Sequence, residues 1–311
     1  QKHLMITSIF SKSKPINFIV VFFITLSAYV IANLKLSNEA FNFNFVIEKS
    51  IIFGICYFSI LTLNFIVGKN NLTQKNNYEI LLYSLFLLML PESLLSDRVI
   101  VSNFFILLAL RRTLSLRSQV NLKKKLFDAS FWVAIASLFY FWAILFFILI
   151  YAVLLLFTDN KIKNWIVPLT GLSTVLLLVI SYSIIINGEF FGVINVSPDV
   201  SFDYSNYNSY KVVIATTILL SFGVWSSIFY LASIRKRMKK VRPIFKAIFI
   251  SLAITFTIMI IAPEKNGSEF LFLFPSLAIV VANYIETIQE KWFKEIFLSI
   301  LIISPIMLLI L

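Results

Sequence analysis

The chain of 311 residues is 59% hydrophobic and only 14% charged, and it carries a formal net charge of +12. A soluble domain is closer to about half apolar and about a quarter charged, so this composition excludes an ordinary water-soluble fold. Lipid around most of the surface explains the apolar excess, because polar side chains are not needed there. The sequence therefore predicts an all-α, polytopic transmembrane helical protein that forms a single integral membrane domain over residues 1–311.

Cysteine and histidine usage limits the chemistry. Cys56 is the single cysteine and His3 the single histidine. A lone cysteine cannot form an intramolecular disulfide or a thiolate metal cluster, and a lone histidine excludes a histidine-based catalytic centre or a histidine-ligated haem. The sequence predicts no metal site and no cofactor, and it leaves open only a divalent cation held by carboxylates.

Apolar runs of about 20 residues predict membrane-spanning helices. The predicted spans are 16–34, 46–67, 78–95, 99–110, 129–157, 164–186, 212–234, 244–262, 269–285 and 295–311. The first run is longer than the apolar core of a signal peptide and lacks an A-x-A-like site, so we expect a retained helix. Met5 is a candidate start of the natural chain, and a start upstream of it is the alternative.

The distribution of Lys and Arg predicts the orientation, because short cytoplasmic loops are enriched in both residues. Lys12 and Lys14 place the segment before the first span in the cytoplasm. The same orientation puts Lys69, Lys75 and the basic stretch 111–125 inside. These clusters also attract anionic headgroups, although membrane topology alone is enough to explain them. No motif in the chain indicates nucleotide hydrolysis or a nucleic-acid partner.

The fifth run, 129–157, is too long for one span and decides the topology. As a single tilted helix it would place the later basic clusters outside, namely 161–163, 235–246 and 291–294. A turn within the run places all of them inside. Tyr140 and Trp142 in its middle favour the turn, because Tyr and Trp prefer the membrane–water interface. We therefore predict a short helical hairpin with these two side chains at its periplasmic tip; a long tilted helix is the alternative.

The hairpin brings the total to about eleven segments, with the N-terminus inside and the C-terminus outside. Each arm would hold only about 12–15 residues, short of the hydrocarbon core. Such helices are tolerated where they line a cavity. The hairpin therefore predicts a cavity open to the periplasm, with Tyr140 and Trp142 as candidate substrate-binding residues.

Acidic residues at the periplasmic helix ends are the candidate catalytic groups. Glu39 lies in the first periplasmic loop, and Asp97 precedes the fourth span. A carboxylate at a membrane cavity can act as a general base or bind a divalent ion on a phosphate. Glu92 and Arg98 flank Asp97 as candidate phosphate or substrate ligands, since a guanidinium fork suits phosphate. A solvated loop, with Ser96 or Asp97 capping the next helix, is the alternative.

Other ionisable residues have structural explanations. Lys49 follows Glu48 near the end of the second span, where it can snorkel to water while Glu48 pairs locally. Glu79 and Asp128 begin helices, where the helix dipole favours a negative charge. We expect Asp128 to form an ion pair with the lysines of 123–125.

Three stretches carry a resemblance to known families: KKLFDASFW at 124–132, AIASLFY at 134–140 and WIVPLTG at 165–171. They resemble an uncharacterised family of polytopic inner-membrane proteins of the Bacteroidota, over most of the chain. A broader resemblance is to the GT-C type, polyprenyl-phosphate-dependent glycosyltransferases, which share a cytoplasmic N-terminus, a similar helix number and a short hairpin at this position. The GT-C resemblance implies a catalytic carboxylate in the first periplasmic loop, where this chain has Glu39. That loop is short here, spanning about 35–45.

The resemblance implies a periplasm-facing transferase of envelope glycan assembly that uses an undecaprenyl-linked donor. The alternative is a non-catalytic membrane subunit or scaffold of an envelope or secretion complex. The expected partners are phospholipid or polyprenyl-phosphate lipid and other membrane proteins, in the bacterial inner membrane. A transporter ranks third, because paired intramembrane charges and broken helices are not evident in the sequence.

Overall fold

The computed structural model describes residues 9–36, 42–157, 161–190 and 198–311, and every regular element within them is helical. The α-helices are α2 (Pro15–Ile31), α3 (Phe43–Asn70), α4 (Tyr78–Met89), α5 (Asp97–Leu114), α6 (Leu122–Phe139), α7 (Phe146–Phe157), α8 (Ile162–Asn187), α9 (Tyr210–Lys236), α10 (Arg242–Ile261), α11 (Leu273–Thr287) and α12 (Lys291–Ile310). The short helices are η1 (Ala32–Leu36), η2 (Pro91–Leu94), η3 (Ser115–Ser118), η4 (Phe141–Leu145), η5 (Ser205–Tyr207) and η6 (Ser268–Phe272). In the described residues, 8 helices are long and apolar enough to cross a membrane.

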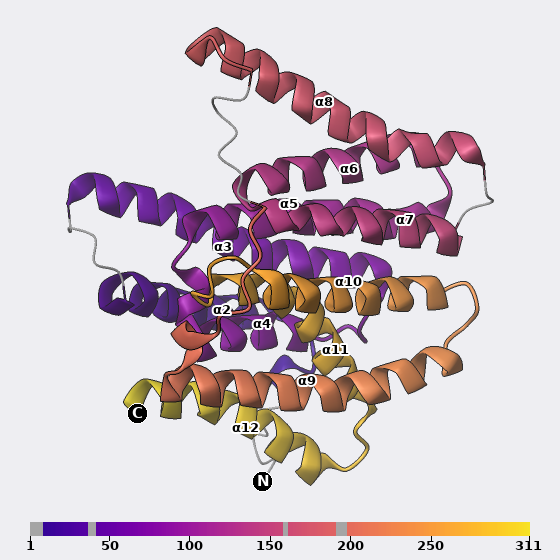
Figure 1. Ribbon diagram of the computed structural model, residues 1–311. Helices are drawn as coiled ribbons and strands as arrows, with labels where there is room; N and C mark the ends of the chain where they lie inside the picture. The colour runs from indigo at the N-terminus through magenta and orange to yellow at the C-terminus, as the bar shows by residue number, and fades with distance from the viewer. Residues whose placement is uncertain (1–8, 37–41, 158–160, 191–197) are drawn as a thin grey trace.

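The helices run alongside one another, with their connections gathered at two opposite ends, while α8 lies at one edge (Figure 1). Helices α4 and α11 form the centre of the bundle. Every residue of α4 is buried, and so are those of α11 from Leu273 to Ile285. The rings of Phe86 and Phe274 lie 5.9 Å apart across this pair. The surrounding helices therefore separate α4 and α11 from lipid.

Each predicted span overlaps a helix, but α4, α6 and α7 are not among the 8 described helices long and apolar enough to cross a membrane, so the predicted total of about eleven spans is not confirmed. Two spans also differ in their bounds. The span predicted at 78–95 ends as an α-helix at Met89, because Pro91 has no N–H to continue the helical bonding, and η2 follows instead. The span predicted at 99–110 is longer, since Ser96 caps the start of α5 by accepting a hydrogen bond from the Val99 N–H. At its other end, the last turn contains basic residues, which the helix dipole favours.

The chain turns back at Tyr140, which has an extended backbone between α6 and η4. Gln119 Nε2, just before α6, donates a hydrogen bond to the carbonyl of Phe157 at the end of α7, so the open ends of both arms lie together. The predicted turn is therefore confirmed. The predicted shortness holds for α7, which has 12 residues, and is wrong for α6, which begins at Leu122 and whose 18 residues extend about 27 Å.

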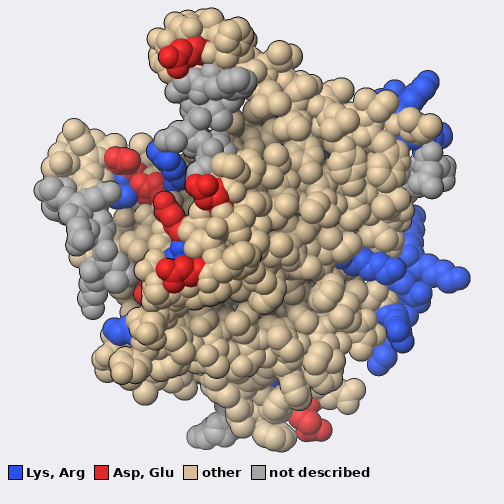
Figure 2. All heavy atoms as spheres, in the orientation of Figure 1, with Lys and Arg blue, Asp and Glu red and all other residues tan. Residues whose placement is uncertain are grey.

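Charge separates the two ends of the bundle (Figure 2). We call the basic end the one where Lys69, Arg112, Lys125 and Lys240 line a common surface pocket. The acidic end is the opposite one, where the hairpin tip lies. Lys123, Lys124 and Lys161 also line one pocket at the basic end, as the turn in 129–157 requires. Loops far apart in sequence thus share a side, in agreement with the charge pattern.

Two carboxylates, those of Asp128 and Glu79, lie at the basic end. Asp128 lies 3.1 Å from the guanidinium of Arg112, so the expected pairing with the lysines of 123–125 is wrong. Glu79 lies in the first turn of α4, as expected, and is fully buried. Within the part of the chain that the structure describes, neither of its carboxyl oxygens has a hydrogen-bond partner.

Candidate functional site at the acidic end

A polar pocket of about 140 Å³ opens at the acidic end, beneath the hairpin tip. Three segments that are distant in sequence form its walls: the start of α5, the α6–η4 turn and the connection from α10 to η6. The lining residues are Ser96, Arg98, Val99, Leu138, Phe139, Tyr140, Phe141, Trp142, Pro263, Glu264 and Ser268. Three residues predicted from the sequence, Arg98, Tyr140 and Trp142, therefore meet in one site.

The start of α5 holds Arg98 at the pocket. Pro91 ends the preceding α-helix, and the chain then folds through η2 to the cap residue Ser96. Ser96 capping, one of the two alternatives for this loop, is confirmed. Arg98 follows in the first turn of α5, with its side chain exposed. The guanidinium group is thus available to an anion that approaches from the aqueous side.

The hairpin tip supplies the aromatic wall. The ring of Tyr140 packs 5.3 Å from that of Phe272 in η6. The Tyr140 hydroxyl is buried and has no hydrogen-bond partner among the described residues. Trp142 Nε1 donates a hydrogen bond of 3.1 Å to the carbonyl of Asp199, which ties the tip to the α8–α9 connection. An unsatisfied hydroxyl beside a polar pocket is a donor free for a ligand.

Asp97 lies between two pocket residues without lining the pocket itself. Its Oδ2 atom is 2.7 Å from Lys49 Nζ, and only 11% and 23% of the Lys49 and Asp97 side chains are exposed. The other carboxylate oxygen, Oδ1, is buried and has no hydrogen-bond partner in the described ranges of the chain. The expectation that Lys49 snorkels to water is wrong, because this lysine crosses from α3 to α5. The ion pair holds the α5 start, and with it Arg98, against α3.

Glu92 faces a different and smaller space. It lines a pocket of about 80 Å³ together with Lys211 of α9. Burial raises the pKa of Glu92, and the positive charge of Lys211 opposes this rise. On the other side, Gly267 packs so closely that a Cβ there would lie 2.8 Å from the Glu92 Cβ. Glu92 therefore contributes to the contact between η2 and η6.

Sequence reasoning missed the connection between α10 and α11. Glu264 and Ser268 line the pocket, and Glu269 beside them is fully buried. Neither carboxyl oxygen of Glu269 has a hydrogen-bond partner among the described residues. The available signal was a short polar stretch, Glu264-Lys265-Asn266-Gly267-Ser268-Glu269, between two apolar runs.

Lys265 stabilises the connection between α10 and α11. Its side chain is buried, and Nζ donates hydrogen bonds to the carbonyls of Met259, at 2.9 Å, and Ile260 at the end of α10. The same Nζ lies 4.7 Å from the centre of the Tyr204 ring. Burial lowers the pKa of Lys265. Lys265 thus caps α10 and fixes the position of Glu264 next to the pocket.

Glu39 lies outside the described residues, so its place relative to the pocket stays a prediction. No cluster of three or more His, Cys, Asp or Glu side chains suited to a metal occurs in the part of the chain that the structure describes.

Residues 5–310 match the model of a family described as a family of unknown function, DUF6427. The chain belongs to this family. No curated protein and no solved structure matches the chain. The DUF6427 match includes the hairpin, η2, η6 and every residue that lines the pocket, so the candidate site lies wholly within the matched residues.

Proposed function

We propose that this DUF6427 protein is a periplasm-facing membrane transferase. It moves a sugar or phosphate-linked group from an undecaprenyl carrier to an acceptor hydroxyl during envelope glycan assembly. The observation that carries this proposal is the polar pocket at the acidic end. There a guanidinium, a carboxylate, two serine hydroxyls and four aromatic side chains surround one space.

The pocket residues match the needs of a lipid-phosphate donor. Arg98 binds the carrier phosphate, because a guanidinium forms paired, charge-assisted hydrogen bonds with phosphate oxygens. Tyr140 donates its unpaired hydroxyl to the same group or to the sugar. Trp142 provides an apolar face for a sugar ring. The volume of about 140 Å³ accommodates the phosphate group, with the rest of the donor outside the pocket.

A carboxylate acts as the general base in this proposal. Glu264, exposed on the pocket wall, takes the proton from the acceptor hydroxyl as the acceptor oxygen attacks the sugar carbon. The bond between that carbon and the carrier phosphate oxygen breaks, and the lipid phosphate leaves with the bonding electrons. Asp97 acts as a positioning residue through Lys49. Glu39, predicted from the GT-C resemblance, is the alternative base.

An apolar groove supports the lipid part of the proposal. It has a volume of about 320 Å³ and lies between α9 and α10, above α11. Its walls include Leu219, Phe256 and Leu273, and Leu273 directly follows η6, which carries the pocket residue Ser268. A groove with apolar walls suits a prenyl chain, whose burial gains about 25 cal/mol per Å² of apolar surface relative to water.

The orientation follows from the charges. The basic end carries the lysine and arginine clusters typical of a cytoplasmic surface, so the pocket at the opposite end opens to the periplasm. This orientation puts the segment before α2 in the cytoplasm and the end of α12 outside. The proposed membrane is therefore the inner membrane of a bacterium.

The proposal is tested by undecaprenyl phosphate binding. Full-length protein in lipid nanodiscs is titrated with this lipid and analysed by native mass spectrometry. We expect Arg98→Gln to weaken binding by about tenfold, the loss of roughly one charge-assisted interaction. The matched control Arg235→Gln removes an exposed guanidinium at the basic end and leaves binding unchanged. Equal affinity for wild type and Arg98→Gln contradicts the proposal.

The second candidate is a non-catalytic membrane subunit of an envelope complex. The small pocket favours it, because ligand sites usually occupy about 300–1,000 Å³. This candidate predicts partner proteins that co-purify in mild detergent at fixed stoichiometry. It also predicts that Arg98→Gln leaves both the assembly with partner proteins and the binding of undecaprenyl phosphate unchanged.

A further inference from the structure

Five cationic side chains converge on one pocket at the basic end of the bundle. The pocket has a volume of about 390 Å³, which is within the usual range of ligand sites. Its cations come from four separate parts of the chain: Lys69 from α3, Arg112 and Arg117 from α5 and η3, Lys125 from α6 and Lys240 from the α9–α10 connection. Asn70, Ser115 and Ser118 add neutral polar groups to the lining.

Negative charge in the protein compensates for little of this positive charge. Arg112 has Asp128 at 3.1 Å, and none of the other four cations forms an ion pair with a carboxylate among the described residues. Lys125 Nζ donates to the Ser115 carbonyl at 2.9 Å and to the Ser118 hydroxyl. Lys69 and Arg112 lie close enough to Lys125 to repel its charge. The positive charges around this pocket therefore repel one another, and a bound anion would relieve that repulsion.

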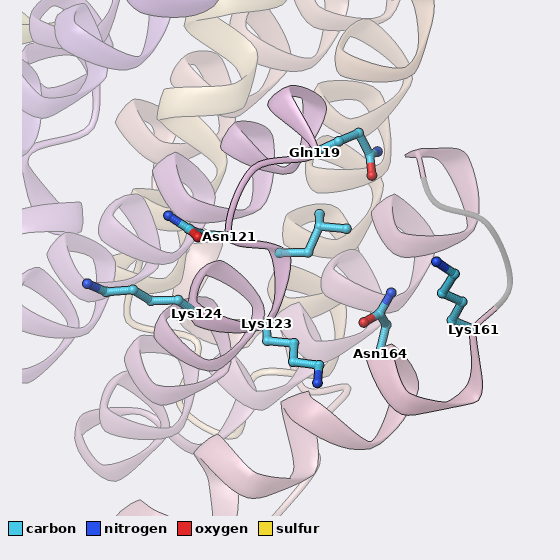
Figure 3. A pocket seen from close by; sticks show the side chains of 7 residues that line it. Gln119, Asn121, Lys123, Lys124, Lys161 and Asn164 are labelled. Carbon is cyan, nitrogen blue, oxygen red and sulfur yellow. The ribbon is translucent and has the colours of Figure 1, made fainter.

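A neighbouring pocket shows that membrane topology alone does not produce this convergence. It is larger, about 640 Å³, and carries Lys123, Lys124 and Lys161. In Figure 3 these lysines do not meet: Lys124 points away from Lys123 and Lys161, and Asn164 lies between Lys123 and Lys161. The positive-inside rule requires basic residues on one side of the membrane, but it does not require them to meet.

We propose that the pocket formed by Lys69, Arg112, Arg117, Lys125 and Lys240 binds a phosphate-bearing anion. The two arginines offer planar forks for phosphate oxygens, and the lysines add point charges and rotatable donors. The pocket lies at the helix ends, at the depth where lipid headgroups meet water. The anion is a phosphate carried by a lipid headgroup or by a soluble compound. The site lies at the opposite end from the proposed transferase pocket and does not depend on it.

The test uses full-length protein in nanodiscs of phosphatidylcholine. One arm adds phosphatidic acid to the bilayer and counts retained lipids by native mass spectrometry. The other adds inorganic pyrophosphate to the buffer and measures affinity calorimetrically. Binding in the lipid arm alone assigns a headgroup, and binding in the soluble arm assigns a soluble phosphate compound; either result supports the site.

Lys240→Gln is the first variant, because Lys240 is exposed in a connection and its loss leaves the helices intact. Its matched control is Lys239→Gln, an adjacent exposed lysine that does not line the pocket. We expect Lys240→Gln to weaken the probe by about threefold to tenfold and Lys239→Gln to leave it unchanged. Equal effects of the two substitutions overturn the proposal, because they indicate a non-specific surface charge.

A triple variant gives an independent readout. Lys69→Gln, Arg117→Gln and Lys240→Gln together remove three cations, and we expect a loss of probe affinity of at least about a hundredfold. Without an anion this variant melts at a higher temperature than wild type, because repulsion is relieved. The control triple variant of Lys123, Lys124 and Lys161 to Gln shows neither change. Absence of binding by wild type to both probes also overturns the proposal.

Discussion

Lys49 and Asp97, separated by 48 residues in sequence, form an ion pair of 2.7 Å between α3 and α5 at the acidic end. Both side chains are largely shielded from water, so each charge depends on the other for compensation. The pair fixes the start of α5 and therefore the position of Arg98 at the pocket.

Lys49→Met keeps the length of the side chain and removes its charge. Asp97 is then buried without its partner, and we expect a loss of about 1–3 kcal/mol in the free energy of unfolding. Unfolding in mixed detergent micelles measures the loss. Adding Asp97→Asn to Lys49→Met restores most of the stability, because no unpaired charge is left. A double variant that is as unstable as Lys49→Met would refute the pairing argument.

Two features require a glycine at position 267: its backbone conformation and its contact with Glu92. Its φ is +93°, and a Cβ there would lie 2.8 Å from the Glu92 Cβ. We expect Gly267→Ala to destabilise the protein by about 1–2 kcal/mol through backbone strain, plus the cost of separating η2 from η6. The measurement is the melting temperature of the purified protein in detergent.

Two other glycines allow the cost of backbone strain to be measured separately from the cost of the contact with Glu92. Gly188 also has a positive φ, +69°, but no atom of the described residues lies within 4 Å of a Cβ there, so Gly188→Ala reports backbone strain. Gly54, in the middle of α3, has equally open surroundings, and Gly54→Ala should stabilise by about 0.5–1 kcal/mol. If Gly267→Ala costs no more than Gly188→Ala, the contact with Glu92 contributes nothing.

The pKa of Glu92 gives a pH dependence with a definite sign. Burial raises this pKa above the value of about 4.3 expected in the unfolded chain. The folded protein therefore retains the proton longer, and its stability falls as the pH rises through the interval between the two values. Glu92→Gln should flatten this part of the stability profile and raise the melting temperature at pH 8. Lys211→Met should make the fall in stability with pH steeper, because the positive charge of Lys211 opposes the rise in the pKa of Glu92. Parallel profiles for wild type and Glu92→Gln would contradict this assignment.

Gly171 attaches α8 to α6. A Cβ at Gly171 would lie 2.1 Å from Ser130 Oγ and 3.0 Å from the Phe127 carbonyl oxygen. Gly171→Ala should therefore loosen α8 and increase proteolysis of the connection between α8 and α9. Ser130→Ala, combined with it, removes the worst overlap and restores part of the protection. Protection equal to wild type in Gly171→Ala would show that α8 is held elsewhere.

Most of the fold could be predicted because the hydropathy and charge of each segment can be read directly from its own residues. Apolar runs located the helices, and the basic clusters required the turn at Tyr140. The ends of α4 and α5 differed because Pro91 and Ser96 act through backbone bonding that hydropathy does not measure.

The site was only partly predictable. Arg98, Tyr140 and Trp142 could be selected by residue type and position at a helix end. The partner of Lys49 could not, because the packing of α3 against α5 is a tertiary property. Glu264 and Glu269 belong to a loop that looks like any other polar connection until η6 folds against η2 and the hairpin tip.

In the proposed orientation, the pocket end of the bundle faces the outside of the inner membrane. In a Cys56→Ala background, which contains no other cysteine, Asn206→Cys and Met238→Cys place one exposed thiol at the acidic and the basic end, respectively. A membrane-impermeant maleimide is added to intact bacterial spheroplasts and then to inverted vesicles. We predict that Asn206→Cys reacts in spheroplasts and Met238→Cys only in inverted vesicles. The opposite pattern, or reaction of both thiols from the same side, would contradict it.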